Sequence, residues 1–222
     1  SGIAGMSSAY HLLRAGVSAV VIDDGRLFSG ESSRTTAHLA SAIDDGFTQI
    51  ERIHGVENAQ VAMTSHAAAI NRIEEIVQLE KIDCDFKRVS GYLASATGDR
   101  NELEAEFLAA QRAGFVNIEM MASGPGGFGD GPCIRYPDQG RIHPLKYLAG
   151  LAEAILRMGG RIFTGTHAEE IEGGKHAHVV TSTGITIRAG SIIVATNSPV
   201  NDKVAIHTKQ APYRSYVIAG CV

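Results

Sequence analysis

The 222-residue sequence predicts an α/β fold: an FAD/NAD(P)-binding, Rossmann-like, three-layer fold with an antiparallel β-meander. Three observations support this class. Gly2 and Gly5 open a helix-like stretch, which Gly16 is expected to end and which leads into the apolar run 19–22. A later apolar run, 191–195, has the composition of a parallel strand buried on both faces, and we expect it to join the run 19–22 in one sheet. Between them, a short strand-like run at 161–164 is followed by three β-rich runs over 167–187 that are separated by glycine turns, which is the pattern of an antiparallel meander.

The opening turn carries the features that a dinucleotide requires. Gly2 would let the backbone approach a pyrophosphate, and Gly5 would let helix and strand pack closely. The free N–H groups of a first helical turn, with the aligned peptide dipoles, hold phosphates. Asp23 follows the apolar run, near the spacing of about 20 residues at which a carboxylate meets a ribose hydroxyl. The sequence therefore predicts a dinucleotide site here.

The first glycine of the usual turn and the strand before it are missing. The sequence is therefore expected to be a fragment that begins inside its own cofactor site, and its last strand-like run stops without a closing signal. Such a fragment is expected to hold a cofactor poorly and to be inactive by itself.

Composition describes a globular protein, with 44% hydrophobic and 20% charged residues and a formal net charge of −4. The negative balance and the lack of a dense Lys/Arg cluster argue against a nucleic-acid partner. No apolar run approaches the length of a membrane span. Cys84, Cys133 and Cys221 are scattered without metal-ligand spacing, so no metal site is predicted. Thiols of this kind are typical of a reducing compartment, and a cytoplasmic location is expected.

A polar loop is expected over 24–41, and the chain after it alternates helical and extended patterns. Apolar spacing predicts helices over 49–81, 102–114 and 144–158. Strands are expected over 86–94, 116–121 and 133–136, and Pro-Asp-Gln-Gly at 137–140 is expected to be a turn. This part predicts an α+β layer interleaved with the nucleotide-binding layer.

Four segments together resemble the FAD-dependent oxidoreductases related to D-amino-acid, glycine and sarcosine oxidases. They are the opening glycine turn with Asp23 and the stretches 33–39, 137–144 and 195–199, and the resemblance spans essentially the whole chain. The Arg-Thr-Thr-Ala-His-Leu form at 34–39 looks most like a bacterial branch in which a C-terminal Rieske iron–sulfur domain follows the flavin domain. The chain has no Cys/His pairs of Rieske spacing, so such a domain is expected only beyond Val222.

The resemblance implies FAD as the cofactor and an amine or amino acid as the substrate, oxidised at its C–N bond by hydride transfer to the flavin. It implies a discontinuous FAD-binding domain over 1–84 and 141–201. A partial substrate-binding domain would comprise 85–140 and 202–222. His38 would approach the isoalloxazine as the catalytic candidate. The implied cofactor-binding residues are Gly2, Ile3, Ala4, Gly5, Asp23, Ser33, Arg34, Thr35, Ala168, Ala195, Thr196 and Asn197.

A substrate carboxylate would suit arginine, which pairs with it in bidentate fashion. Arg135, Tyr136 and Arg214 are the candidates for this role. Two other functions remain open. A nicotinamide-dependent dehydrogenase would share the opening turn but would not need the meander. A non-catalytic flavin-binding module would keep the nucleotide motif without responding to substrate.

Overall fold

The computed structural model describes residues 1–95, 98–126 and 131–197, and the chain divides into two compact units. Among the described residues, the first unit combines 1–32 with 155–197, and the second is formed by residues between 33 and 154. Helix α5, Pro144–Arg157, begins in the second unit and ends in the first. The predicted boundaries of the FAD-binding and substrate-binding domains stay predictions.

The first unit begins with helix α1, Ile3–Arg14, which ends where the sequence predicts. Gly16 has a φ of 77°, a left-handed conformation that glycine adopts without steric cost. The turn at Gly16 lets the Val17 N–H donate to the Leu12 carbonyl at 2.9 Å, which closes the helix with a Schellman motif. Strand β1, Val20–Ile22, follows.

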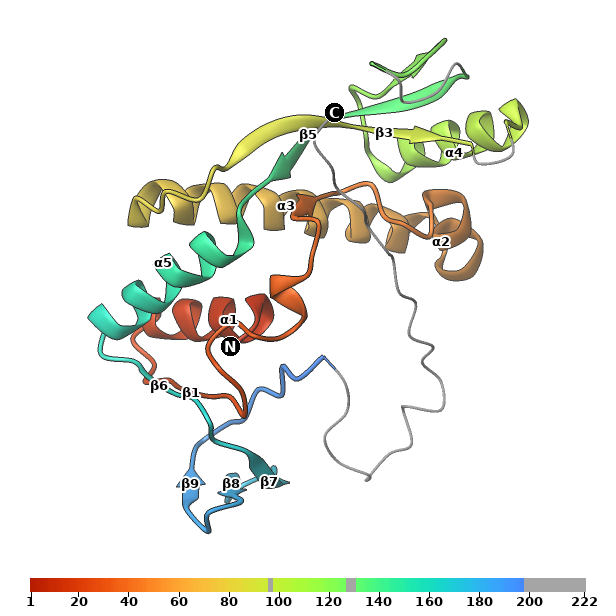
Figure 1. Ribbon diagram of the computed structural model, residues 1–222. Coiled ribbons are helices and arrows are strands. Elements are labelled where there is room, and N and C mark those ends of the chain that lie inside the picture. Colours follow the sequence, from red (N-terminus) through yellow and green to blue (C-terminus); the bar gives the residue numbers. More distant parts are fainter. Residues whose placement is uncertain (96–97, 127–130, 198–222) are drawn as a thin grey trace. The chain divides into compact units, whose positions relative to one another are not determined.

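Two strands that lie far apart in the sequence pair in this unit. β1 lies parallel to β6, Arg161–Phe163, with Val21 opposite Ile162. Strands β7 (Ala168–Glu172), β8 (His178–Thr181) and β9 (Thr186–Arg188) form an antiparallel meander, labelled in Figure 1. The meander was predicted, and so was a sheet shared by an early and a late segment of the chain, although not the partner that β1 takes. These features confirm the α/β class.

The strand predicted over 191–195 does not form. These residues have no regular secondary structure, and the side chains of Ile193 and Val194 are 57% and 48% exposed. An apolar run becomes a strand only where a neighbour supplies ladder hydrogen bonds, and no described strand pairs with this run. The expectation that it joins β1 in one sheet was therefore wrong.

The second unit contains an antiparallel sheet built around its longest strand, β5, Cys133–Arg141. Strand β3, Lys87–Ala94, pairs along one edge of β5. The short strands β2 (His38–Leu39) and β4 (Glu119–Met121) pair with the two ends of its other edge.

A bulge in β5 replaces the turn predicted at 137–140. Val89 pairs with Gln139 and Gly91 pairs with Tyr136, so two residues of β5 oppose one residue of β3. Asp138 takes up the extra length with a φ of 59°. The Pro-Asp-Gln-Gly sequence has turn composition, but pairing along the whole of β3 keeps it in the strand. The expected turn was therefore wrong.

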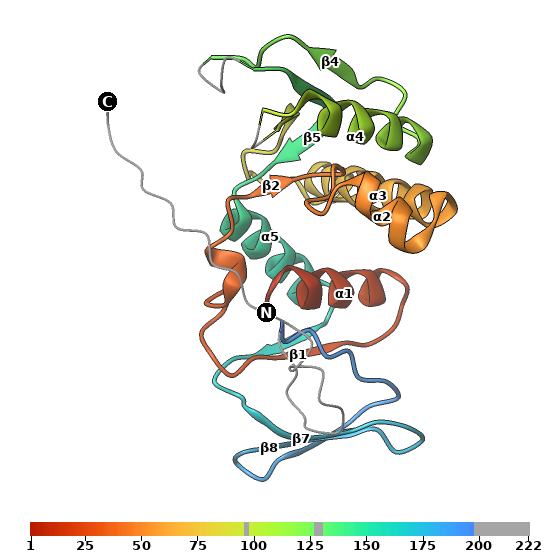
Figure 2. The ribbon, with the colours of Figure 1, turned by 90° about the vertical axis from the view of Figure 1, so that its right-hand side faces the viewer.

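Three helices lie on one side of β5 in Figure 2: α2 (Phe47–His54), α3 (Val56–Glu80) and α4 (Arg100–Ala113). Helices α3 and α4 contact β5, and α2 packs against these two helices. The single helix predicted over 49–81 is broken at Gly55, whose φ is 82°. One buried hydrophobic cluster of this unit brings residues of these helices together with residues of β5, and it contains Phe47, Ala59, Leu103, Ala109, Ala110, Ala113, Ile118, Ile134 and Tyr136.

Candidate functional site

The start of α1 is the predicted phosphate-binding turn. Gly2 is the N-cap residue of α1, and its backbone is extended. Because glycine has no side chain, Gly2 makes no side-chain capping hydrogen bond. The Ile3 N–H donates to the Ser32 hydroxyl at 3.1 Å, so a residue from the loop after β1 occupies one of the first-turn donors. A Cβ at Gly2 would meet that hydroxyl at 3.2 Å. The first turn carries no acidic residue, so nothing there repels an anion.

Asp23 lies directly after β1, as predicted. Its Oδ2 accepts a hydrogen bond from the Ser1 hydroxyl at 2.6 Å, and its Oδ1 accepts one from the Gly25 N–H at 2.9 Å. Burial raises the pKa of the carboxyl, but hydrogen bonds from the Ser1 amino group, the Ser1 hydroxyl and Gly25 outweigh it and lower the pKa. The carboxylate is thus ionised and keeps lone pairs for further donors.

The cofactor candidates from the later part of the chain belong to the first unit, which also contains Gly2 and Asp23. A Cβ at Gly5 would lie 3.5 Å from the Cβ of Ala195, so the late segment reaches the first turns of α1. Asn197 has a φ of 65°. Ala168 opens β7, where it pairs with Thr181. Their roles in holding a cofactor stay predictions, as does that of Thr196.

The remaining candidates from the loop before β2 belong to the second unit. Ser33 and Thr35 line a hollow of about 460 Å³ together with Lys87, Arg141 and His143. His38 opens β2 opposite Arg141, and its ring lies toward Gly91. The assignments of Ser33, Arg34, Thr35 and His38 to the cofactor path stay predictions.

The predicted substrate residues have other neighbours. Arg135 donates to Glu119 at 2.7 Å and to the Ser90 hydroxyl at 3.1 Å. Tyr136 is 1% exposed, and its hydroxyl has no hydrogen-bond partner among the described residues. Burial, and then the charge of Glu106, raise the pKa of Tyr136. Its ring therefore belongs to the core. Arg214 lies outside the described residues, and the substrate role of all three stays a prediction.

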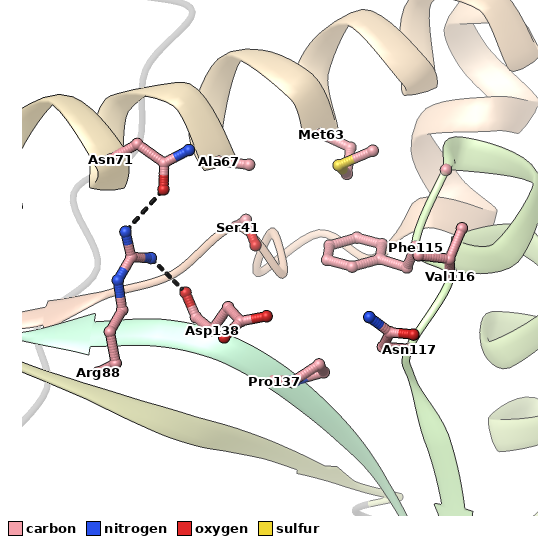
Figure 3. Close-up of a pocket in the computed structure, with 11 residues that line it drawn as sticks. Ser41, Met63, Ala67, Asn71, Arg88, Phe115, Val116, Asn117, Pro137 and Asp138 are labelled. Atoms are coloured by element: carbon pink, nitrogen blue, oxygen red, sulfur yellow. Dashed lines mark hydrogen bonds between the residues drawn. The ribbon is translucent and has the colours of Figure 1, made fainter.

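A second hollow, of about 440 Å³, lies between α3 and β5. Figure 3 shows Arg88 reaching from β3 to Asn71 and to Asp138, and the guanidinium donates to Asn71 Oδ1 at 2.6 Å and to the Asp138 carbonyl at 2.7 Å. Glu74 Oε2 accepts two more hydrogen bonds from it. Arg88 is therefore fully engaged, and Met63 and Phe115 give the other side of this hollow an apolar wall.

Within residues 1–95, 98–126 and 131–197, no group of His, Cys, Asp or Glu side chains could hold a metal ion. No described helix combines the length and the hydropathy that a membrane crossing requires.

Residues 1–220 match the family described as FAD dependent oxidoreductase. The chain belongs to this family. The resemblance noted in the sequence is thereby confirmed, and FAD is the cofactor on which the family depends.

Two curated relatives cover most of the chain. The protein YhfW of Bacillus subtilis (strain 168), whose name places it among Rieske 2Fe-2S iron-sulfur proteins, is 29% identical over 98% of this chain and 43% of its own length. Gamma-glutamylputrescine oxidoreductase of Escherichia coli (strain K12) is 28% identical over 91% of this chain and 49% of its own length. The chain thus spans less than half the length of these two relatives.

Solved structures show the same fold. L-amino acid deaminase from Proteus vulgaris superposes with a TM-score of 0.65 at 20% identity, covering 85% of this chain and 44% of that one. Glycine oxidase from Geobacillus kaustophilus gives a TM-score of 0.61 at 16% identity, covering 87% and 52%. These likenesses confirm the predicted FAD-binding, Rossmann-like fold.

The first unit fits parts of FAD. The start of α1 offers backbone donors and lacks side chains at Gly2 and Gly5, which suits a pyrophosphate. The ionised Asp23 suits the ribose hydroxyls. Sequence reasoning selected Ser33 and overlooked Ser32, although the hydroxyl that reaches Ile3 belongs to Ser32. The pattern Glu-Ser-Ser signalled hydroxyls here without showing which of them faces the helix.

Proposed function

We propose that the protein containing this chain is an FAD-dependent oxidoreductase that oxidises an amine or amino acid at its C–N bond. The observation that carries the proposal is the family match over residues 1–220. Two names support the substrate class: one curated relative is a gamma-glutamylputrescine oxidoreductase, and one structural neighbour is an L-amino acid deaminase.

A bound flavin supplies the electron acceptor for such an oxidation, and the protein supplies binding and orientation. The start of α1, with Gly2 and Gly5, would hold the pyrophosphate, and Asp23 would hold the ribose. Ser33, Arg34 and Thr35 would follow the path toward the flavin ring. His38, at the start of β2, would face the reacting end of the cofactor. This division of labour requires no catalytic triad.

Two other functions make different predictions. A nicotinamide-dependent dehydrogenase would give no flavin absorbance, and a non-catalytic flavin-binding module would be yellow but unaffected by substrate. The meander β7–β9 goes beyond what a nicotinamide-binding half requires, which favours the flavin enzyme. A Rieske domain beyond Val222 and a cytoplasmic location stay predictions.

The test uses the full-length protein that contains this chain. We expect it to purify yellow and to lose absorbance near 450 nm, roughly where oxidised flavins absorb, when an amine or amino acid is added without oxygen. His38→Asn should slow this bleaching while leaving the bound flavin in place. His54→Asn, on the exposed end of α2, is the matched control and should bleach as the wild type does. A colourless protein that reduces NAD would overturn the proposal.

A further inference from the structure

Two polar side chains of the hollow between α3 and β5 are without partners. Asp138 and Asn117 both line this hollow of about 440 Å³, a size within the range of about 300–1,000 Å³ of small-molecule sites. In the described part of the chain, neither side chain makes a hydrogen bond or an ion pair. The charge of the Asp138 carboxylate is therefore not offset by contact with a cation.

The bulge in β5 directs Asp138 to this place. Asp138 takes up the extra length of β5 with a left-handed φ of 59° and has no paired residue in β3. A bulge of this kind re-aims a side chain, and bulges are frequent beside functional sites. Figure 3 shows the Asp138 side chain and the Phe115 ring extending into the same hollow.

Two arginines near Asp138 are already balanced by glutamates. Arg88 donates to the carbonyl of Asp138, and its guanidinium pairs with Glu74 at 2.6 Å. Arg135 pairs with Glu119 at 2.7 Å. The pKa of Arg135 is raised first by this hydrogen bond and less by the charge of Asp138. Each of these positive charges thus has its own carboxylate, and the negative charge of Asp138 remains available to a ligand.

The rest of the wall is aromatic and apolar. The Phe115 ring packs edge to face on Phe47 and on Tyr136, with ring centroids 5.3 Å and 5.1 Å apart, so the core fixes its position. Met63 lies beside it, and Val116 is 87% exposed at the rim. An aromatic face attracts a cation placed within about 6 Å of its centroid, and apolar side chains take up the carbon groups of a ligand.

We propose that this hollow binds a small organic ammonium ion, with its charge against Asp138 and its carbon groups against Phe115 and Met63. The amide oxygen of Asn117 can accept a hydrogen bond from an ammonium N–H. A metal ion would require several oxygen ligands, and among the described residues no group of His, Cys, Asp or Glu side chains could hold one. The predicted cofactor residues do not line this hollow, so the site is independent of the proposed oxidation.

The experiment compares the dissociation constants of tert-butylammonium and uncharged tert-butanol for the full-length protein, measured by ligand-observed NMR. The two probes have the same shape. The carbon bonded to nitrogen carries no hydrogen, so tert-butylammonium is not oxidised at its C–N bond by hydride transfer. We expect wild type to prefer the ammonium ion by about five-fold, the scale of a solvent-accessible ion pair beside an aromatic ring.

Asp138→Asn should lose this preference, because it removes the charge, and asparagine also tolerates the left-handed backbone. Asn117→Asp should increase the preference, since it adds a second carboxylate at an exposed position of the hollow. Glu170→Gln, which removes an exposed carboxylate of β7 outside the hollow, is the matched control and should bind both probes as wild type does.

Equal affinities of wild type for the two probes would overturn the inference. So would a preference that stays unchanged in Asp138→Asn while circular dichroism shows that variant folded, or one that stays unchanged in Asn117→Asp. The proposed oxidation is tested by flavin bleaching, which does not use these probes, so the two proposals fail separately.

Discussion

At the scale of single residues, Asp23 decides whether the nucleotide assignment is right. Its carboxylate is ordered by contacts to Ser1 and Gly25, so its position does not depend on a ligand. A preorganised carboxylate loses little conformational entropy when it accepts the ribose hydroxyls. Burial raises the pKa of the carboxyl, but the hydrogen bonds to its oxygens outweigh this and lower the pKa, so the acceptor is charged at neutral pH.

Asp23→Ala in the full-length protein is expected to weaken FAD binding by about 1.5–3 kcal/mol, the range for hydrogen bonds to a charged group. The fold should survive, because Asp23 ends its strand and is not part of the core. Titration of the apoprotein with FAD measures the effect, with Asp24→Ala as the neighbouring control. Equal affinities in the Asp23 variant and wild type would remove Asp23 from the site.

Residue pairs show why some of the site could be predicted and some could not. Gly2, Gly5 and Asp23 lie within one local pattern, and that pattern has a fixed spacing. The pairing of Lys87 with Arg141 joins residues far apart in sequence, and its register depends on the bulge at Asp138. A pattern of residue types does not determine which residues of two strands lie opposite each other, so the pairing of Lys87 with Arg141 could not be predicted before the sheet was known.

At the scale of elements, α2 depends on a side chain from another helix. Glu106 of α4 accepts hydrogen bonds from the Phe47 N–H at 2.6 Å, the Thr48 N–H at 2.9 Å and the Thr48 hydroxyl at 2.7 Å. The first N–H groups of a helix have no partner within it, so Glu106 caps α2 from outside. Sequence periodicity located α4 and placed most of α2 within one longer predicted helix, but it gave no sign of this contact.

Glu106→Ala is expected to destabilise the protein by about 1–2 kcal/mol, because two donors at the start of α2 lose their acceptor. Urea unfolding at neutral pH measures the free energy. Glu104→Ala is the matched control from the same helix: Glu104 pairs only with the exposed Arg100, and its removal should change stability by less than about 0.5 kcal/mol. Similar effects of the two substitutions would contradict the capping role.

Helix limits at Gly16 and Gly114 agree closely with the sequence, since both are glycines with left-handed backbones that end a helix. The break at Gly55 was overlooked because apolar spacing continues on both sides of it. The strand predicted over 191–195 failed for a different reason. Hydrophobicity indicates what a segment could bury, but a partner strand decides whether it pairs.

At the scale of the whole molecule, the chain spans only part of its relatives, so cofactor binding has to be tested in the full-length protein. The nucleotide residues Gly2, Gly5 and Asp23 all belong to the unit that contains α1, β1 and β6. A ligand that binds the folded state alone stabilises it by an amount that grows with the logarithm of the ligand concentration relative to Kd. This stabilisation reaches about 2.7 kcal/mol at a ligand concentration of one hundred times Kd.

The full-length protein is therefore expected to gain about 2.7 kcal/mol of unfolding free energy at this FAD concentration. Its amide exchange should slow in peptides that cover the first turn of α1 and strand β1. These segments carry the predicted phosphate and ribose contacts, and their backbone groups become shielded when the ligand is held. Peptides from α4, whose Arg100 and Glu104 are exposed, serve as the internal reference.

Asp23→Ala should show a smaller gain in unfolding free energy at the same FAD concentration. Protection confined to segments outside α1 and β1 would place the cofactor elsewhere, because shielding follows the surface that a ligand covers.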